Sequence, residues 1–151
     1  MLPHAGAMAL VLAGGFFGAA GREAVEQALP TVAGSFPSAT LAINLAGAFA
    51  LGLVLEVLLR AGGPAAWPRR ARLCAGTGFL GAFTTYSTFA VQAAQLGRAG
   101  HVGTAAAYVV ATVAGGLLAV AAGIFVAGGT ARRGRSGLPV DPDVDPERPP
   151  R

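Results

Sequence analysis

The chain of 151 residues has no lysine, one cysteine and few charged side chains. All 11 basic residues are arginines, and this bias, together with abundant alanine and glycine, indicates a GC-rich bacterial genome. The lone Cys74 cannot form a disulfide within the chain. Charged residues make up 12 % of the sequence, against about 25 % in soluble domains. A surface this poor in charge is unsuited to water and indicates that lipid is the solvent.

Catalytic patterns are also missing. The sequence has no nucleophile–base pair and no carboxylate dyad, and Gly76-Thr-Gly-Phe79 lacks the Gly-Lys-Ser/Thr ending of a phosphate-binding loop. Most arginines lie between long apolar runs, whereas nucleic-acid binding needs basic clusters interleaved with stacking aromatics. The sequence therefore predicts neither an enzyme nor a nucleic-acid-binding protein.

Four long charge-free intervals divide most of the chain. A helix crosses the hydrocarbon core with about 20 residues, so each interval holds one span. The pattern predicts an all-α integral membrane fold with four transmembrane helices and a transmembrane domain over residues 1–128. The expected spans are 5–28, 38–60, 72–95 and 102–128.

The two ends of the chain differ in composition from the spans between them. Ala5, Ala7 and Ala19–Ala20 resemble processing sites, so the first span could be a signal peptide, but residues 1–4 lack the positive charge that begins one. We therefore expect a transmembrane span. Residues 129–151 are rich in proline and aspartate and have little apolar surface to bury, so we expect a disordered tail.

The arginines are distributed unevenly between the two sides of the predicted bundle. Four spans place both termini and the central loop on one side. The other side has Arg98, with Arg22 near the end of the first span. The positive-inside rule then predicts cytoplasmic termini, and the bias of seven to two predicts a single orientation. The seven are Arg60, Arg69, Arg70, Arg72, Arg132, Arg133 and Arg135.

The third predicted span combines glycines with a run of hydroxyl side chains. Residues 84–88 contain four serines or threonines and Tyr86. Glycine and threonine both weaken a helix, and a helix interrupted at mid-membrane is tolerated where it lines a cavity or binds an ion. The alternative is a packing surface whose hydroxyls bond to their own backbone. The residues alone leave both interpretations open.

Other polar residues in the spans are less specific. The Asn44 amide in the second span could donate to an anion, but a helix–helix hydrogen bond is the more common use. The i,i+4 spacing of Arg22 and Glu26 predicts a helix-stabilising ion pair. Tyr108 could be either a packing residue or a pore hydroxyl.

The segment Gly78-Phe-Leu-Gly-Ala-Phe-Thr-Thr-Tyr-Ser-Thr-Phe89 resembles the third-helix signature of the Fluc or CrcB fluoride channels. Gly18-Ala-Ala-Gly-Arg22, the stretch from Thr40 to Gly47 and Tyr108 support the resemblance, which covers roughly residues 8–128. The resemblance implies an antiparallel dimer with two narrow pores in a bacterial plasma membrane. Fluoride, which enters cells as neutral HF and ionises there, would leave passively through these pores.

The resemblance also implies roles for individual residues. A structural Na⁺ at the dimer centre would be held by the backbone carbonyls of Gly81 and Thr84. Asn44 would donate to fluoride, and Arg22 would be structural. The remaining pore residues would be Tyr86 and Phe89 as aromatics, Ser87 and Thr88 along a polar track, and Tyr108 as a pore tyrosine.

The chain departs from the family pattern at three positions. Tyr86 stands where phenylalanine is usual, Ala82 where a second glycine is common, and Glu23 where an aromatic is common. Because the charge bias predicts one orientation, our hypothesis is that the chain pairs with an oppositely oriented homologue.

Two alternatives to a conducting fluoride channel subunit remain. One is a non-conducting structural subunit that completes a partner's pore. The other is a proton-coupled small multidrug transporter. Such a transporter needs a membrane-embedded carboxylate, and Glu23 and Glu26 are too close to the end of the first span to supply it.

Overall fold

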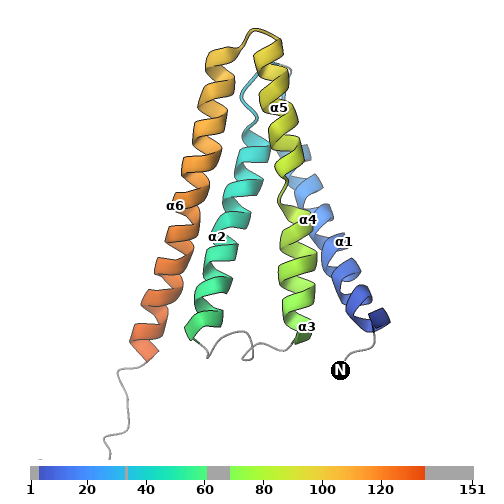
Figure 1. Ribbon diagram of the computed structural model, residues 1–151, viewed down its shortest axis with the longest axis vertical. Coiled ribbons are helices and arrows are strands. Elements are labelled where there is room, and N and C mark those ends of the chain that lie inside the picture. The colour runs from blue at the N-terminus through green and yellow to red at the C-terminus, as the bar shows by residue number, and fades with distance from the viewer. Residues whose placement is uncertain (1–3, 33, 61–68, 135–151) are drawn as a thin grey trace, which may run out of the picture.

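The computed structural model describes residues 4–32, 34–60 and 69–134, and every regular element in them is a helix (Figure 1). Three long helices are α1 (His4–Ala28), α2 (Ser38–Arg60) and α6 (Val102–Gly134). Between α2 and α6 lie four shorter elements end to end, which we call the composite segment. They are α3 (Arg69–Ala71), the π-helix η1 (Arg72–Leu80), α4 (Gly81–Phe83) and α5 (Tyr86–Arg98).

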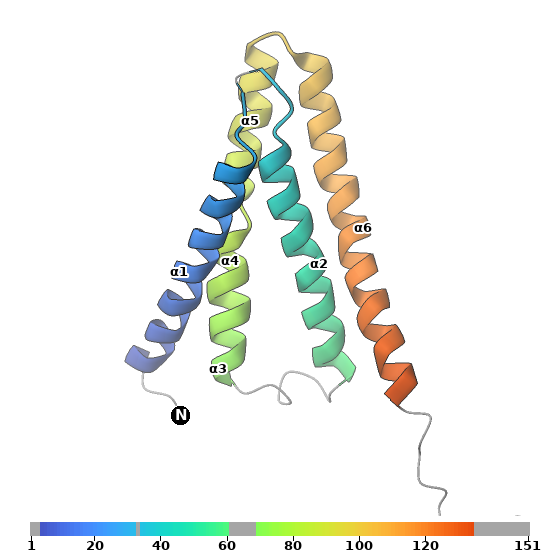
Figure 2. The ribbon, with the colours of Figure 1, turned by 180° about the vertical axis from the view of Figure 1, so that it is seen from behind.

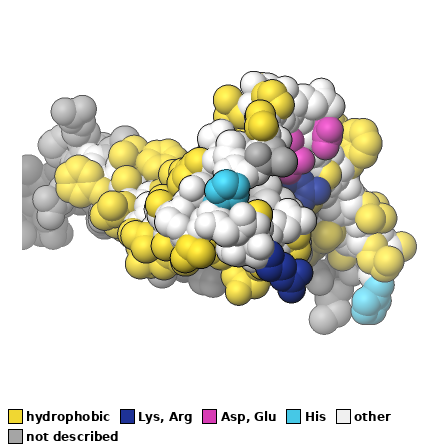
Figure 3. Space-filling model, turned by 90° about the horizontal axis from the view of Figure 1, so that it is seen from above, with side chains coloured by type: hydrophobic (Ala, Val, Ile, Leu, Met, Phe, Trp, Pro, Cys, Tyr) yellow, Lys and Arg dark blue, Asp and Glu magenta, His cyan; other side chains and the backbone are white. Residues whose placement is uncertain are grey.

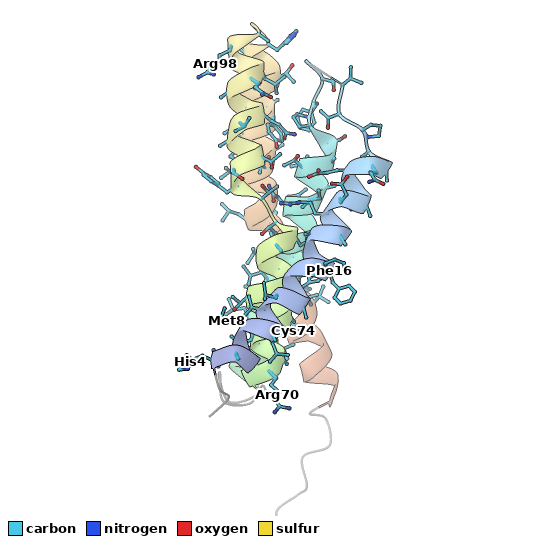
Figure 4. The ribbon with its side chains drawn as sticks, turned by 90° about the vertical axis from the view of Figure 1, so that its right-hand side faces the viewer. His4, Met8, Phe16, Arg70, Cys74 and Arg98 are labelled. Carbon is cyan, nitrogen blue, oxygen red and sulfur yellow. The ribbon has the colours of Figure 1, made fainter. Side chains whose placement is uncertain are left out.

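Within the part of the chain that the structure describes, three helices are long and apolar enough to cross a membrane: His4–Ala28, Ser38–Val57 and Val102–Gly129. Their outer faces carry large apolar side chains in the open, such as Phe16 on α1 at 70 % exposure (Figure 4). In the view along the long axis of the molecule, most coloured side chains are hydrophobic and few are charged (Figure 3). These helices match the first, second and fourth predicted spans.

The composite segment occupies the position of the third predicted span, 72–95. It runs over residues 69–98 and is interrupted at Thr84 and Thr85, which are not helical. Because of the interruption, no single helix in the composite segment has membrane-spanning length. The composite segment is therefore not one of the three membrane-spanning helices named above.

The predicted tail begins too early. Helix α6 continues to Gly134, so residues 129–134, which we expected to be disordered, are helical. Arg132 and Arg133 lie within α6, so the basic residues that follow the apolar run do not end the helix. The rest of the predicted tail, 135–151, and residues 61–68 of the connection expected between the second and third spans lie outside the described residues.

Close backbone contact joins the helices in two pairs. α1 packs along η1 and α4, while α2 packs along α6, whose first half also contacts α5 (Figure 2). A Cβ atom on Gly14 or Gly18 of α1 would collide with backbone carbonyls of η1, and one on Gly52 of α2 would collide with a carbonyl of α6. Small residues let helices approach this closely in lipid, where packing contact replaces the hydrophobic effect.

The two ends of the molecule differ in charge. The start of α1, the end of α2, α3 and the end of α6 lie at one end, which we call the arginine-rich end (Figure 1). Arg70 lies there and Arg98 at the opposite end (Figure 4). Five more arginines belong to helix ends located at the arginine-rich end: Arg60, Arg69, Arg72, Arg132 and Arg133.

Candidate ion pathway around the interrupted helix

Two extended residues break the composite segment between α4 and α5. Thr84 has φ −79° and ψ 153°, and Thr85 has φ −144° and ψ 115°. The backbone N–H and the hydroxyl of Thr84 both donate to the Leu80 carbonyl, at 3.1 and 3.0 Å. The last helical bond before the break is therefore doubled by a side chain.

Asn44 of α2 binds the break directly. Its Nδ2 donates to the Thr85 carbonyl at 3.0 Å, and its Oδ1 accepts from the Thr85 N–H at 2.9 Å. The amide thus pairs with one residue as a neighbouring strand would. This is the helix–helix hydrogen bond that the residue type favours. Because the Asn44 amide has two N–H bonds, one remains for a further acceptor.

Thr85 also begins α5. Its buried hydroxyl accepts from the Thr88 N–H at 3.2 Å, which makes Thr85 the N-cap, and donates to the Thr88 hydroxyl at 2.9 Å. The Ser87 hydroxyl lies 3.4 Å from the same oxygen. Three hydroxyls therefore gather at the first turn of α5, where backbone N–H groups lack intrahelical acceptors.

The same bonds redirect two backbone donors. In a continuous α-helix the N–H of residue i+4 donates to the carbonyl of residue i, so Gly81 would accept from Thr85 and Thr84 from Thr88. Here Thr85 donates to Asn44, and Thr88 donates to the Thr85 hydroxyl. The carbonyls of Gly81 and Thr84 are therefore among those at the break that lose their helical donors.

These two carbonyls suit a hard cation. Carbonyl oxygens at unwound helix positions coordinate Na⁺ in membrane proteins. Gly81 is exposed, and a Cβ atom built on it would meet nothing within 4 Å, so the backbone there is open to approach. Among the described residues no three His, Cys, Asp or Glu gather. The donor set therefore fits the sodium site that the sequence resemblance implies.

A groove connects the break with α2. It has a volume of about 380 Å³ and is lined by Asn44 and Gly47 of α2 and by Gly81 and Thr84 across from them. The amide proposed for the anion and the carbonyl-bearing residues proposed for the cation thus share one open space.

Aromatic rings form a line beyond the break. The ring centroids of Tyr86 and Phe89 are 5.9 Å apart, those of Phe89 and Tyr108 are 5.3 Å apart, and those of Tyr108 and Phe36 are 5.6 Å apart. Tyr86, at the outer end of the line, is 81 % exposed, and Tyr108 is completely buried. The line runs from exposed Tyr86 on α5 through buried Tyr108 to Phe36, which is 36 % exposed.

The buried hydroxyl of Tyr108 is held by polar partners. It donates to Gln92 Oε1 at 2.9 Å, and the side chain of Thr40 shares a hydrogen bond with Tyr108. Sequence reasoning missed both partners. Their signals were a glutamine one helical turn after Phe89 and a threonine one turn before Asn44.

The predicted site residues therefore do not all lie together. Asn44, Thr84, Ser87 and Thr88 are connected through Thr85, and Tyr86, Phe89 and Tyr108 are connected through their rings. The side chains of Tyr86 and Ser87 are also exposed. Arg22 lies apart from these residues, on α1. It forms the ion pair that its spacing predicts, with its Nε 4.0 Å from Oε1 of Glu26.

The comparison with known families settles the relationship. The family described as "CrcB-like protein, Camphor Resistance (CrcB)" matches residues 9–124. The chain belongs to this family. The CrcB-like match covers α2, the composite segment and most of α1 and α6.

Relatives of this CrcB-like chain carry functional names. It is 46 % identical over 121 residues to fluoride-specific ion channel FluC 2 of Leifsonia xyli subsp. xyli, covering 80 % of this chain and 83 % of the relative. It is 45 % identical over 109 residues to FluC 1 of Cutibacterium acnes (72 % and 76 %), and 42 % identical over 118 residues to FluC of Methylobacterium nodulans (78 % and 92 %). Together with the three apolar helices, this makes the chain a membrane protein.

Proposed function

We propose that this protein is a subunit of a fluoride-selective ion channel, which lets cytoplasmic fluoride leave the cell passively and so reduces fluoride toxicity. The observation that carries the proposal is the similarity, at 42 to 46 % identity, to proteins named fluoride-specific ion channels. The hydroxyls and aromatic rings gathered at the interrupted helix support it. They are groups that can replace the water around a small anion.

The composite segment is proposed as the fourth membrane span of the subunit, third in chain order, broken near the membrane centre. Two subunits then pair antiparallel. Tyr86, at 81 % exposure, and the exposed Ser87 support this pairing, because polar groups of a membrane span rarely face lipid. A partner subunit would cover them and complete two pores.

The proposed pore offers donors without a fixed positive side chain. Asn44 would give its second N–H to fluoride, and the hydroxyls of Tyr86, Ser87 and Thr88 would follow. The Tyr108 hydroxyl, which donates to Gln92, would donate to fluoride only by exchanging that acceptor. The ring of Phe89 would add its positive edge, since aromatic edges attract anions. Fluoride is strongly hydrated, and these groups would compensate for the water that it loses.

Sodium would have a structural role in this channel. The Gly81 and Thr84 carbonyls would hold it at the dimer centre, and its charge would favour anions in the two pores beside it. The redirected N–H groups of Thr85 and Thr88 support this assignment, because they leave those two carbonyls for another partner.

The subunit is proposed to insert in one orientation, with both termini in the cytoplasm, and to pair with an oppositely oriented homologue. The charge difference between the arginine-rich end and the opposite end supports this. A tag fused after Arg151 is expected to react with a membrane-impermeant reagent only after the cells are opened. Labelling of intact cells to a comparable extent would contradict the single orientation.

A non-conducting role within such a pair is the second candidate. The observation that favours it is Tyr86, whose hydroxyl stands in the aromatic line where the family usually has phenylalanine. In that case fluoride would cross only through the pore lined by the partner's residues, and changing Asn44 or Phe89 would leave transport unaltered.

Growth tests the proposed function in cells. A bacterial strain without its own fluoride channel is expected to grow in fluoride when it makes this chain, alone or together with an oppositely oriented homologue. Growth at raised chloride serves as the control and should not change. Fluoride sensitivity in every combination, with the protein detected in the membrane, would argue against the proposal.

A further inference from the structure

Two residues of α2 hold the break from the same face of the helix. Asn44 and Gly47 are one turn apart, so they lie side by side on α2. Asn44 binds the N–H and carbonyl of Thr85 at 2.9 and 3.0 Å. Gly47 lies directly under Thr84, because a Cβ atom built on Gly47 would collide with the Cγ2 methyl of Thr84.

Both branches of the Thr84 side chain are thereby fixed. The hydroxyl donates to the Leu80 carbonyl at 3.0 Å, and the methyl fills the space that Gly47 leaves. A β-branched side chain has few χ1 states to begin with. Holding both branches fixes the Thr84 backbone and, with it, the direction of its carbonyl.

Asn44 has a corresponding effect on the other carbonyl. The Thr85 N–H is the donor that Gly81 would receive in a continuous helix. As long as Asn44 Oδ1 accepts this N–H at 2.9 Å, Gly81 is not bonded by it. Without that acceptor, the Thr85 N–H would be an unpaired buried donor, and closing the helix onto Gly81 would be the nearest way to satisfy it.

We propose that Asn44 and Gly47 form a clamp on α2 that keeps the helix open and directs the carbonyls of Gly81 and Thr84 toward a cation. They are positioning residues for the cation site, and for Asn44 this role is separate from donating to fluoride. The inference rests on the proposed function for the identity of the cation, which is sodium.

Two substitutions at Asn44 separate these roles. Asn44→Asp keeps an oxygen that can accept the Thr85 N–H but removes the donor and adds a negative charge, which repels fluoride. Asn44→Ala removes both functions. We expect sodium chloride, compared with N-methylglucamine chloride, to raise the melting temperature of the purified full-length wild-type protein and of Asn44→Asp, but not of Asn44→Ala. Fluoride efflux is expected to be lost in both variants.

Gly47 gives an independent test with its own rescue. Gly47→Ala places a methyl against Thr84 and should abolish the sodium-dependent rise. Adding Thr84→Ser removes the colliding methyl, keeps the hydroxyl that binds Leu80, and should restore the rise. Gly116→Ala on α6 is the matched control, since a Cβ atom there meets nothing within 4 Å, and it should behave as wild type.

The outcomes separate the clamp from the channel. A sodium-dependent rise that persists in Asn44→Ala or disappears in Asn44→Asp, or a Gly47→Ala defect that Thr84→Ser does not repair, would overturn the clamp and leave the sodium site standing. Wild-type protein without any sodium-dependent rise would overturn the sodium site itself, and the clamp would fall with it. If Asn44→Ala does not fold, the Gly47 series decides alone.

Discussion

Fluoride efflux from liposomes is expected to fall about 100-fold when Phe89 is replaced by isoleucine, which corresponds to about 2.7 kcal/mol of added barrier. The Phe89 ring lies between Tyr86 and Tyr108, with centroids 5.9 and 5.3 Å away. Isoleucine keeps an apolar side chain there but has no positive ring edge to face an anion. The measurement is the initial rate recorded with a fluoride electrode.

The control for this substitution is Phe125→Ile on α6. Phe125 is 81 % exposed on a helix of membrane-spanning length, so its replacement should leave the rate at the wild-type level. Equal rates for Phe89→Ile and the wild type would remove the aromatic line from the conduction pathway and would favour the non-conducting role.

Thr85→Val is expected to reduce both stability and transport. The two side chains have nearly the same shape, but valine cannot accept the Thr88 N–H or donate to the Thr88 hydroxyl. Loss of an N-cap costs about 1 to 2 kcal/mol. In addition, the Thr88 N–H would be free to donate to the Thr84 carbonyl, as in a continuous helix. That carbonyl would then no longer be available to the cation. We expect a lower melting temperature, no sodium-dependent stabilisation, and efflux reduced by about tenfold or more.

Thr77→Val provides the comparison, because Thr77 is an exposed threonine of η1 in the same composite segment. It should leave the sodium response unchanged. If Thr85→Val only lowered the melting temperature and kept the full sodium response, the cap would be structural, and the redirected Thr88 N–H would have no part in the cation site.

The helices themselves were largely predictable from the sequence. The bounds expected for α2, 38–60, are those observed, and α1 begins one residue earlier than expected. Such accuracy follows from physics, because charged residues are costly in lipid and mark the ends of apolar helices. The end of α6 was missed because the charge pattern ends at Arg132, whereas a helix accepts arginines in its last turn.

The glycine and threonine pattern of the composite segment left two interpretations open, and the structure contains both. The Thr84 hydroxyl bonds to its own helix at Leu80, as a packing surface would, and yet the helix is interrupted at Thr84 and Thr85. What decides between them is the bond from Asn44 to Thr85, which joins residues 41 positions apart. No local pattern contains such a contact.

The partners of Tyr108 could not be predicted from the sequence either, because they are also distant from it along the chain. Gln92 and Thr40 lie on other helices, and Phe36 lies in the short connection before α2. Each residue is unremarkable by itself. Only the packing of α5 and α2 against α6 makes them the surroundings of one buried hydroxyl.

The most direct test of the account is fluoride efflux from liposomes that contain the purified chain, with and without an oppositely oriented homologue. Chloride efflux is followed in parallel. A fluoride-selective channel should release fluoride rapidly and retain chloride, in the paired liposomes at the least. Liposomes that release neither ion, or both at similar rates, in both preparations would contradict it.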